Sequence, residues 1–428
     1  MDTIFALASS PGKSGVAVVR VSGPKAPDLG RQLIGDSLRP RYAHYGTICD
    51  DDGQHIDDAL ILFFEGPKSF TGEDVLELQI HGSIAVVSAV LAFLGAKKGL
   101  RHAEPGEFTR RALENNKLDL SQVEALSDLV EAETEGQRLQ AQRVLKGGLR
   151  DRCEGWRAQL IRAVSLLEVS IDFADEDVPE DVTPEVIEIL AVVSSSFDQE
   201  LSKSAGAERV RTGYDVAILG APNVGKSSLL NYLVGRDAAI TSKIAGTTRD
   251  IIEVQMDLSG LPVTFVDTAG VRETSDEIER EGIKRAIMRA EEADIALFLS
   301  LEGDLPDGLD DMPNSYIILT KGDITGRDEA ISVKTGAGID NLIDKVVTVL
   351  SEKFPSSGVL IRQRHLGAVS LARDSVNCAL NMLQDESAVF ELASEELRRA
   401  LHQLEMLVGR VDVENILDEI FSSFCLGK

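Results

Sequence analysis

The stretch YDVAILGAPNVGKSSLLNYLVG, residues 214–235, decides the fold. Its first third has the apolar pattern of a buried strand and its last part the pattern of a helix, and residues 220–227 between them match G-x-x-x-x-G-K-[ST] in full. Glycines let the backbone bend so that its N–H groups face phosphate oxygens, and the helix N-terminus adds positive partial charge. The stretch therefore predicts a phosphate-binding loop within an α/β nucleotide-binding domain.

Individual residues of this loop and of VDTAG (266–270) have expected roles in binding a nucleotide. We expect Lys226 to reach the β- and γ-phosphates and Ser227 to bind Mg²⁺ through its hydroxyl. Asp267 ends an apolar strand and can hold the same Mg²⁺ through water, and the N–H of Gly270 can meet the γ-phosphate. Lys226 and Asp267 are therefore candidate catalytic residues.

The sequence TKGD (320–323) distinguishes guanine from adenine. Asp323 can accept hydrogen bonds from the N1–H and 2-amino groups of guanine, and adenine offers neither donor. Lys321 can cover the base with its alkyl stem. Thr320 stands where such motifs usually have Asn, which predicts a somewhat weaker affinity for guanine. Taken alone TKGD fits an ordinary turn, but the nearby SVKTGAG (332–338) resembles the loop that backs the base in GTPases, so we predict GTP rather than ATP.

Two further parts of the reaction are open at this point. In GTTRD (246–250) we favour Thr248 over Thr247 as a second Mg²⁺ contact. Val271 stands where related enzymes have a glutamine that orients water, and a carboxylate within residues 271–281 can replace it, although most of that segment fits a solvated helix face. Asn223 and the carbonyls of residues 241–248 can form a cage for a monovalent cation, which would stabilise charge between the β- and γ-phosphates.

Changes of pattern divide the chain into three kinds of structure. Residues 1–117 alternate strand, turn and helix signals and predict an α+β domain. Helical patterning follows in residues 118–210, with Ser121 and Glu124 as an expected capping box. Residues 211–354 predict the doubly wound α/β domain, and residues 355–428 are again helical. We expect the two helical segments to form one bundle into which the α/β domain is inserted.

Composition narrows the class of protein. The chain has 428 residues, 43% of them hydrophobic, and a net charge of −27, which is unsuited to gripping nucleic acid through a basic surface. Its four cysteines lack metal-site or paired spacing and fit a reducing compartment. No stretch approaches the roughly 20 apolar residues of a membrane span. We expect a soluble, cytoplasmic protein without a membrane contact.

Several blocks of the sequence resemble the MnmE (TrmE) family of tRNA-modifying GTPases along the whole chain. They include GAPNVGKSSLLN (220–231), IAGTTRD (244–250), DTAGVRETSDEIE (267–279), SFTGEDVLELQIHGS (69–83) and IFSSFCLGK (420–428). The resemblance implies a tetrahydrofolate-binding and dimerisation domain, a helical domain in two segments and an inserted Ras-like GTPase domain. It also implies a homodimer that works with the flavoprotein MnmG (GidA), as a heterotetramer or larger assembly.

The implied reaction is K⁺-stimulated GTP hydrolysis coupled to modification of tRNA. An aminomethyl or carboxymethylaminomethyl group is added to carbon 5 of the wobble uridine, and the one-carbon unit comes from 5-formyl- or methylene-tetrahydrofolate. By resemblance, Asn223, Ser242, Ile244 and Thr247 would hold K⁺, while Thr248 would bind Mg²⁺ beside Ser227.

The resemblance also assigns residues that the motifs alone leave open. Glu279 would position the attacking water. Arg20, Glu77, Lys117 and Lys428 would contact folate, although a surface ion pair is the simpler reading of the first three without the resemblance. The residues expected to bind GTP lie in five segments: Asn223, Val224, Gly225, Lys226, Ser227, Ser228; Ser242, Lys243, Ile244, Ala245, Gly246, Thr247, Thr248; Asp267, Thr268, Ala269, Gly270; Thr320, Lys321, Gly322, Asp323; and Ser332, Val333, Lys334.

The sequence CLGK (425–428) allows three readings: a lipidation box, a frayed terminal tail without a role, and part of a site built elsewhere in the chain. It is a poor lipidation box because Lys is unusual at the final position and no polybasic stretch precedes it. As the family's terminus, it would bring Cys425 and Lys428 to the folate site, where Cys425 is a candidate nucleophile if its pKa is lowered. Two rival functions are an Era-type switch that binds RNA directly, which the negative charge disfavours, and a P-loop ATPase, which Asp323 disfavours.

Overall fold

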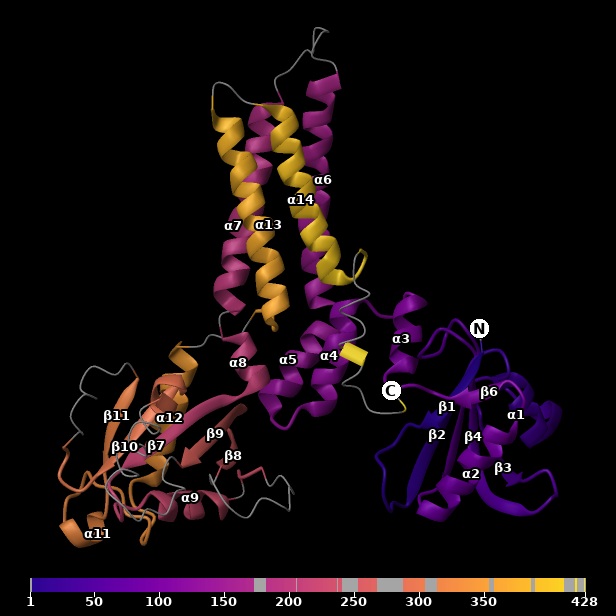
Figure 1. Cartoon of the computed structure of the whole chain (residues 1–428), viewed down its shortest axis with the longest axis horizontal. Helices are drawn as coiled ribbons and strands as arrows, with labels where there is room; N and C mark the ends of the chain where they lie inside the picture. The colour runs from indigo at the N-terminus through magenta and orange to yellow at the C-terminus, as the bar shows by residue number, and fades with distance from the viewer. Residues whose placement is uncertain are drawn as a thin grey trace. The chain divides into compact units, whose positions relative to one another are not determined.

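The computed structural model describes most of the chain (Figure 1). The described residues are 2–172, 182–204, 206–236, 238–240, 253–267, 288–304, 314–353, 358–385, 389–411, 420–421 and 427. They fall into two compact units, one made of residues 1–127 with 405–428 and the other of residues 128–404.

The first unit contains a six-stranded sheet in the order β3-β4-β5-β2-β1-β6. The pairs are antiparallel except for β1 with β6. Its strands are β1 Thr3–Leu7, β2 Val16–Ser22, β3 Ala43–Cys49, β4 His55–Phe64, β5 Val75–His81 and β6 Leu100–His102. The accompanying helices are α1 Ala26–Ile34, a short 3₁₀ turn Gly35–Ser37, α2 Ile84–Ala96, α3 Glu107–Glu114 and α4 Leu120–Glu131.

The two faces of this sheet differ because side chains alternate along each strand. On β2, Ala17, Val19 and Val21 enter a core that also contains residues of α1 and α2. The intervening positions, including Arg20, belong to the opposite face. Arg20 lies directly across from Glu77 of β5. The sheet therefore brings two predicted folate contacts together.

Helices from both flanks of the α/β segment build one bundle in the second unit. Trp156 of α6 donates a hydrogen bond of 2.9 Å to Ser196 of α7, and Arg398 of α14 lies 2.7 Å from Glu168 of α6. Helices α6 and α7, which precede the α/β segment, and helices α13 and α14, which follow it, lie side by side in Figure 1, in agreement with the predicted insertion of one domain into a bundle. The helices are α5 Glu135–Leu145, α6 Gly148–Asp172, α7 Thr183–Ser204, α8 Ala207–Thr212, α13 Gln363–Gln384 and α14 Phe390–Val408.

The inserted segment is a doubly wound α/β domain, as predicted. Its sheet has the order β11-β10-β7-β9-β8, in which only β8 runs antiparallel to its neighbour. Val216 and Ile218 of β7 enter the core on one face, and Ala217 and Leu219 enter a smaller core on the other. The elements are β7 Tyr214–Gly220, α9 Lys226–Val234, β8 Glu253–Leu258, β9 Leu261–Asp267, β10 Ile295–Ser300, β11 Ser315–Leu319, α11 Gly322–Thr325 and α12 Ile339–Lys353.

Strand β7 is the topological switch point of this sheet. Its two neighbours, β9 and β10, both follow it in the chain but lie on opposite sides of it. Ligands of such sheets bind beyond the carboxyl end of the strand at the switch point. That end of β7 leads directly into the predicted phosphate loop.

One expected helix start was wrong. Asp119, not Ser121, caps α4: its carboxylate accepts the N–H of Gln122 at 2.9 Å, while the side chain of Gln122 accepts the N–H of Asp119 at 3.0 Å. The reciprocal box is therefore two residues earlier than predicted, and Ser121 instead donates to Asp119 at 2.6 Å. Within the described residues, none of the helices is both long and apolar enough to cross a membrane.

Candidate functional site

The phosphate loop connects β7 to α9 through backbone conformations with positive φ, which most residues adopt only with strain. Gly220 has φ of 144°, and a Cβ there would lie 2.4 Å from the carbonyl oxygen of Leu299. Gly225 has φ of 118° and Asn223 has φ of 62°. Asparagine tolerates the left-handed region better than most residues. The glycines of the motif are thus required by the backbone.

Lys226 is buried at the start of α9 and is 7% exposed. Its ammonium donates hydrogen bonds to two loop carbonyls, those of Gly220 at 2.6 Å and Ala221 at 3.0 Å. Burial lowers the pKa of Lys226, and the negative charge of Asp267 partly opposes this. The lysine is therefore held at the loop, where a phosphate group would exchange with these carbonyls as its partner.

Ser227 and Asp267 form the metal end of the candidate site. The hydroxyl of Ser227 donates to the carboxylate of Asp267 at 3.1 Å. Asp267 is buried at the end of β9. A hydroxyl and a carboxylate are oxygen donors of the kind that Mg²⁺ prefers. The two side chains lie together and fit such an ion.

The base motif is joined to the phosphate loop by a direct hydrogen bond. Thr320 is 4% exposed, and its hydroxyl donates to the carbonyl of Val224 at 2.9 Å. Lys321 has φ of 57°, and at Gly322 a Cβ would lie 2.5 Å from the carbonyl oxygen of Ala330. The turn after β11 is therefore tight.

Asp323 is oriented by a neighbour that the motif itself does not contain. The hydroxyl of Ser332 donates to its carboxylate at 2.8 Å. Ser332 is buried, and its own backbone is fixed by bonds to Ala337 and Gly336. The loop of Ser332, Val333 and Lys334 thus supports, through the hydroxyl of Ser332, the carboxylate that is expected to bind guanine. The resemblance noted from SVKTGAG corresponds to this contact.

Several predicted site residues lie outside the described part of the chain. For the nucleotide site these are Ser242, Lys243, Ile244, Ala245, Gly246, Thr247, Thr248, Thr268, Ala269, Gly270 and Glu279, and for the folate site Cys425 and Lys428. Of the described nucleotide-site residues, 223–228 and 320–323 lie on loops and helix ends that follow strands β7 and β11, Asp267 ends β9, and 332–334 lie in the loop before α12.

Arg20 and Glu77 form an ion pair of 3.0 Å on the sheet of the first unit, with about a fifth of each side chain exposed. Aromatic rings flank the guanidinium: it lies 5.1 Å from the ring of Phe70 and 5.7 Å from that of Phe108. Arginine stacks well on such rings. The structure therefore presents a carboxylate and a planar cation side by side, in a partly apolar setting.

Lys117 contacts the loop that also carries Phe70. Its ammonium donates to the carbonyl of Pro67 at 3.0 Å, and the same loop, residues 65–74, contributes Phe70. Gly72 lies against the stem of Lys117, where a Cβ would be 3.2 Å from Cγ. The loop therefore contacts Lys117 and, through Phe70, also Arg20, which is paired with Glu77.

Other features of this unit were missed from the sequence. Phe70 and Phe108 carry no motif that assigns them to Arg20. Arg111 is buried among carboxylates, with Glu107 at 2.9 Å and Glu73 at 3.0 Å. Gly427 lies against β1, where a Cβ would be 1.9 Å from the carbonyl oxygen of Leu7. The blocks SFTGEDVLELQIHGS (69–83) and IFSSFCLGK (420–428), already noted, contain Phe70, Glu73 and Gly427 but assign these contacts to none of them.

His81, at the end of β5, is held by a buried carboxylate. Asp57 accepts the backbone N–H of His81 at 2.8 Å and contacts ring atom Nδ1 at 2.7 Å. The ring itself is largely exposed. Asp57 therefore fixes the end of β5.

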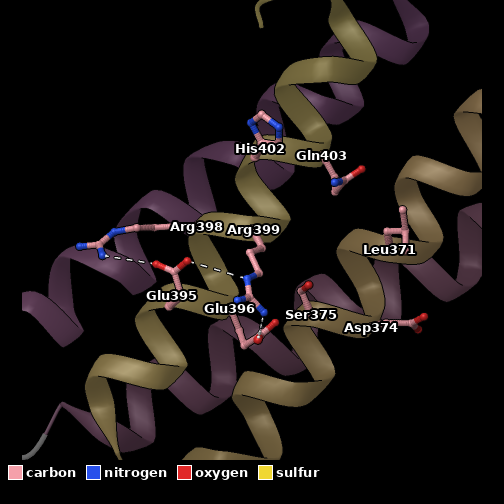
Figure 2. A pocket seen from close by; sticks show the side chains of 9 residues that line it. All are labelled: Leu371, Asp374, Ser375, Glu395, Glu396, Arg398, Arg399, His402 and Gln403. Atoms are coloured by element: carbon pink, nitrogen blue, oxygen red, sulfur yellow. Dashed lines mark hydrogen bonds and ion pairs between the residues drawn. The ribbon is translucent and has the colours of Figure 1, made fainter. Parts of the chain in front are cut away.

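The helical bundle has a groove of about 610 Å³ between α13 and α14 (Figure 2). Its charged walls are paired: Arg399 lies 2.6 Å from Glu396, and Arg398 lies 2.7 Å from Glu168. None of the predicted site residues that the structure describes lines it.

Three features define a P-loop GTPase. They are the phosphate loop at the switch point, the pair of Ser227 and Asp267, and the carboxylate of Asp323, which Ser332 orients for binding guanine. A family model described as the MnmE helical domain matches residues 120–425, and one described as the GTP-binding protein TrmE N-terminus matches residues 3–117. The chain therefore belongs to the MnmE family, and the resemblance noted from the sequence is confirmed.

Curated relatives match from end to end. The tRNA modification GTPase MnmE of Dinoroseobacter shibae is 55% identical over 430 residues, and that of Ruegeria pomeroyi is 52% identical over 429 residues; both alignments cover 100% of each chain. Among solved structures, an Era variant of Aquifex aeolicus bound to GDP and AlF₄⁻ is 26% identical. That match covers 40% of this chain and 68% of the other with a TM-score of 0.26, a similarity too low to support a structural inference.

Proposed function

We propose that this chain is a K⁺-stimulated GTPase that modifies tRNA together with the flavoprotein MnmG. The added group is an aminomethyl or carboxymethylaminomethyl at carbon 5 of the wobble uridine, with the one-carbon unit taken from a tetrahydrofolate. The protein would act as a cytoplasmic homodimer. The observation that carries the proposal is the Arg20–Glu77 pair in a TrmE N-terminal domain, on the same chain as an oriented guanine motif.

In the GTPase site, the chain's own groups bind and orient GTP. Lys226 exchanges its loop carbonyls for the β- and γ-phosphates, and Asp323, oriented by Ser332, selects guanine. Ser227 and Thr248, with Asp267 through a water molecule, would hold a Mg²⁺ ion, which would supply positive charge to the phosphates. Asn223, with Ser242, Ile244 and Thr247, is our proposed set of K⁺ ligands, and Glu279 our proposed water-positioning residue. The domain boundaries after residues 117, 210 and 354 belong to the same proposal.

In the folate site, Glu77 suits the amino-pyrimidinone edge of a pterin, whose N–H groups a carboxylate can accept. Arg20 and Lys117 suit the anionic tail, and Lys428 is proposed as a further cation. The rings of Phe70 and Phe108 flank Arg20 and supply apolar surface. Cys425 is the candidate nucleophile of this site. Glu77 thus offers the acceptor, and Arg20 and Lys117 the positive charges, that binding of a tetrahydrofolate would use.

The first experiment is GTP turnover in KCl and in NaCl at matched ionic strength. We expect K⁺ to stimulate hydrolysis strongly and the variant Asn223→Ala to lose the stimulation. Because Asn223 has positive φ, Asn223→Gly is the better matched variant: it removes the side-chain oxygen and accepts this backbone without strain. Equal rates in the two salts would contradict the cation site and direct attention to an arginine supplied by a partner.

An Era-type switch that binds RNA directly is the second candidate function. A direct RNA contact favours a basic module, whereas this chain has a net charge of −27. Binding of 5-formyl-tetrahydrofolate to the full chain separates the two candidates. Failure to bind it, together with normal GTP turnover, would favour the switch.

A further inference from the structure

The β8–β9 hairpin of the GTPase domain ends in a tight two-residue turn. Ser259 has φ of 56° and Gly260 has φ of 90°, as in a type I′ turn. The carboxylate of Asp257 accepts the N–H of Gly260 at 2.6 Å and braces the turn from inside. The carbonyl of Gly260 is left to bond outside the hairpin.

The N-terminus of α5 supplies two donors to that one carbonyl. The hydroxyl of Thr134 donates to it at 2.9 Å, and the backbone N–H of Gly136 donates at 3.1 Å. A Cβ on Gly136 would lie 2.2 Å from the same oxygen, so only glycine permits the approach. We call Thr134, Gly136 and Gly260 the hairpin clamp.

Strand β9 of the clamped hairpin leads to the nucleotide site, and strand β8 is bonded to the segment that precedes the expected cation loop in the sequence. Strand β9 ends in Asp267, whose carboxylate is 3.1 Å from the Ser227 hydroxyl. Strand β8 bonds along its outer edge to residues 238–240: Asp257 N–H to Ala238 at 2.9 Å and Ile240 N–H to Gln255 at 2.8 Å. That segment continues into residues 241–248, the expected cation and Mg²⁺ loop.

Helix α5 also holds the chain where it enters the GTPase domain. The side chain of Gln137 donates to the carbonyl of Arg211 at 3.1 Å, and that of Gln140 donates to Ala207 at 2.6 Å. Both acceptors belong to α8, which leads into β7. A displacement of β9 relative to β7 would therefore strain the clamp or move α5.

We propose that Thr134 and Gly136 are positioning residues for GTP hydrolysis, which act through the β8–β9 hairpin on Asp267. The clamp favours one placement of the hairpin. GTP, whose γ-phosphate and Mg²⁺ require that placement, binds more tightly when the clamp is closed than when it is open. By reciprocity, the bound nucleotide changes the strength of the clamp by the same factor. Helix α5 is then the route by which the GTPase site and the helical segment affect each other.

The test is the ratio of GDP affinity to affinity for a non-hydrolysable GTP analogue, measured on the full chain with Mg²⁺ and K⁺. Thr134→Asp keeps a good helix cap, because Asp accepts the N–H of Gln137, but it cannot donate to Gly260 and places a negative charge against its carbonyl. Gly136→Ala opens the clamp by a steric clash. We expect each variant to change the affinity ratio about fivefold or more, the lower range of measured couplings between sites.

Two controls separate positioning from folding. Thr134→Ser keeps both the cap and the donor, so its affinity ratio and kcat should stay within twofold of the original chain. Gly155→Ala makes the same substitution within α6, where a Cβ meets nothing within 4 Å. A purely structural clamp would lower the melting temperature of Thr134→Asp and Gly136→Ala while their affinity ratio and kcat remained unchanged, and that result would overturn the proposal. If Gly136→Ala fails to fold, Thr134→Asp against Thr134→Ser decides alone.

Discussion

The hydroxyl of Thr320 donates a 2.9 Å hydrogen bond to the backbone carbonyl of Val224. This bond joins the motif that selects the base to the loop that binds the phosphates. Val224 is also part of the domain core, so the carbonyl is held in place from both sides. The hydroxyl of Thr320 therefore joins the two halves of the nucleotide site. The sequence indicated only that Thr320 lacks the amide of the usual Asn and did not suggest this bond.

Replacing Thr320 by Val should weaken nucleotide binding. Val has nearly the same shape but no donor, so a buried carbonyl loses its partner, at a cost of about 1–3 kcal/mol. We expect the affinity for GDP and GTP to fall about tenfold, as measured by titration with a fluorescent guanine nucleotide. Thr320→Ser keeps the donor and is the control. An affinity within twofold of the original in Thr320→Val would show that the bond does not position the loop.

Asp323→Asn should change the preferred base. The amide can accept one hydrogen bond and donates in place of the second, which matches xanthine and mismatches guanine. A site built to bond a substrate group rejects the wrong partner by factors of about 10⁴, so GTP hydrolysis should nearly vanish while XTP becomes a substrate. Hydrolysis of both nucleotides should be measured at equal concentration.

Ser332→Ala tests how far the orientation of Asp323 matters. It removes the 2.8 Å donor but leaves the carboxylate. We expect the KM for GTP to rise by about threefold to tenfold with guanine still preferred, since one hydrogen bond to a charged group is worth about 1.5–3 kcal/mol and water replaces part of it. A switch in base preference in this variant would mean that Ser332 itself contacts the base.

The sequence was sufficient for features that depend on local pattern. The order strand, GAPNVGKS, helix predicts the phosphate loop because each element is read from neighbouring residues. Phe70 around Arg20 and Thr134 on Gly260 were not predictable in this way. These contacts join residues 50 or more positions apart, and no periodicity in either partner indicates the other.

The cap of α4 shows a different limit. Both Asp119-Leu-Ser-Gln and Ser121-Gln-Val-Glu fit the capping-box pattern. The prediction named only the second. The structure uses Asp119 because helix α4 already includes Ser121. Helix boundaries are set by packing that overlapping local signals do not resolve.

Acid should weaken the first unit through Glu107. Burial alone would raise its pKa, but hydrogen bonds from Arg101, from the N–H of Glu104 and from Arg111 outweigh this, so the pKa lies below its ordinary value of 4.5. A lowered pKa in the folded state means that the stabilisation is complete above about pH 4.5 and is lost as the pH falls through the folded pKa. Glu107→Gln should therefore be destabilising at pH 7, and the difference from the original chain should shrink below pH 4.5.

Hydrogen exchange of β1 and α3 measures this, because a chain of several domains has no single unfolding free energy. The loss of about 2 kcal/mol expected for hydrogen bonds to a charged group corresponds to roughly 30-fold lower protection at pH 7. Glu185→Gln, in an exposed pair with Arg162, is the control and should change protection little. Equal protection of the Glu107→Gln variant and the original chain at pH 7 would contradict the assigned role.

The last prediction concerns the Arg20–Glu77 pair, which decides whether the first unit binds folate. Glu77→Gln keeps the size of the side chain but replaces one acceptor oxygen by a donor, so it should mismatch the amino-pyrimidinone edge and leave Arg20 with a weaker partner. Arg20→Lys keeps the charge but loses the planar group between Phe70 and Phe108.

We expect each change to lower the affinity for 5-formyl-tetrahydrofolate at least tenfold in isothermal titration, while GTP turnover without tRNA stays within twofold. Asp28→Asn removes a charge from an exposed pair on α1 of the same unit and should leave both quantities unchanged. If Glu77→Gln and Arg20→Lys bound folate as tightly as the original chain, the pair would be a structural contact, and the folate would have to be sought elsewhere on the unit. If both variants lost folate binding but retained the hydrogen-exchange protection of β2 and β5, the loss would lie in recognition, because the strands that carry the two residues would still be folded.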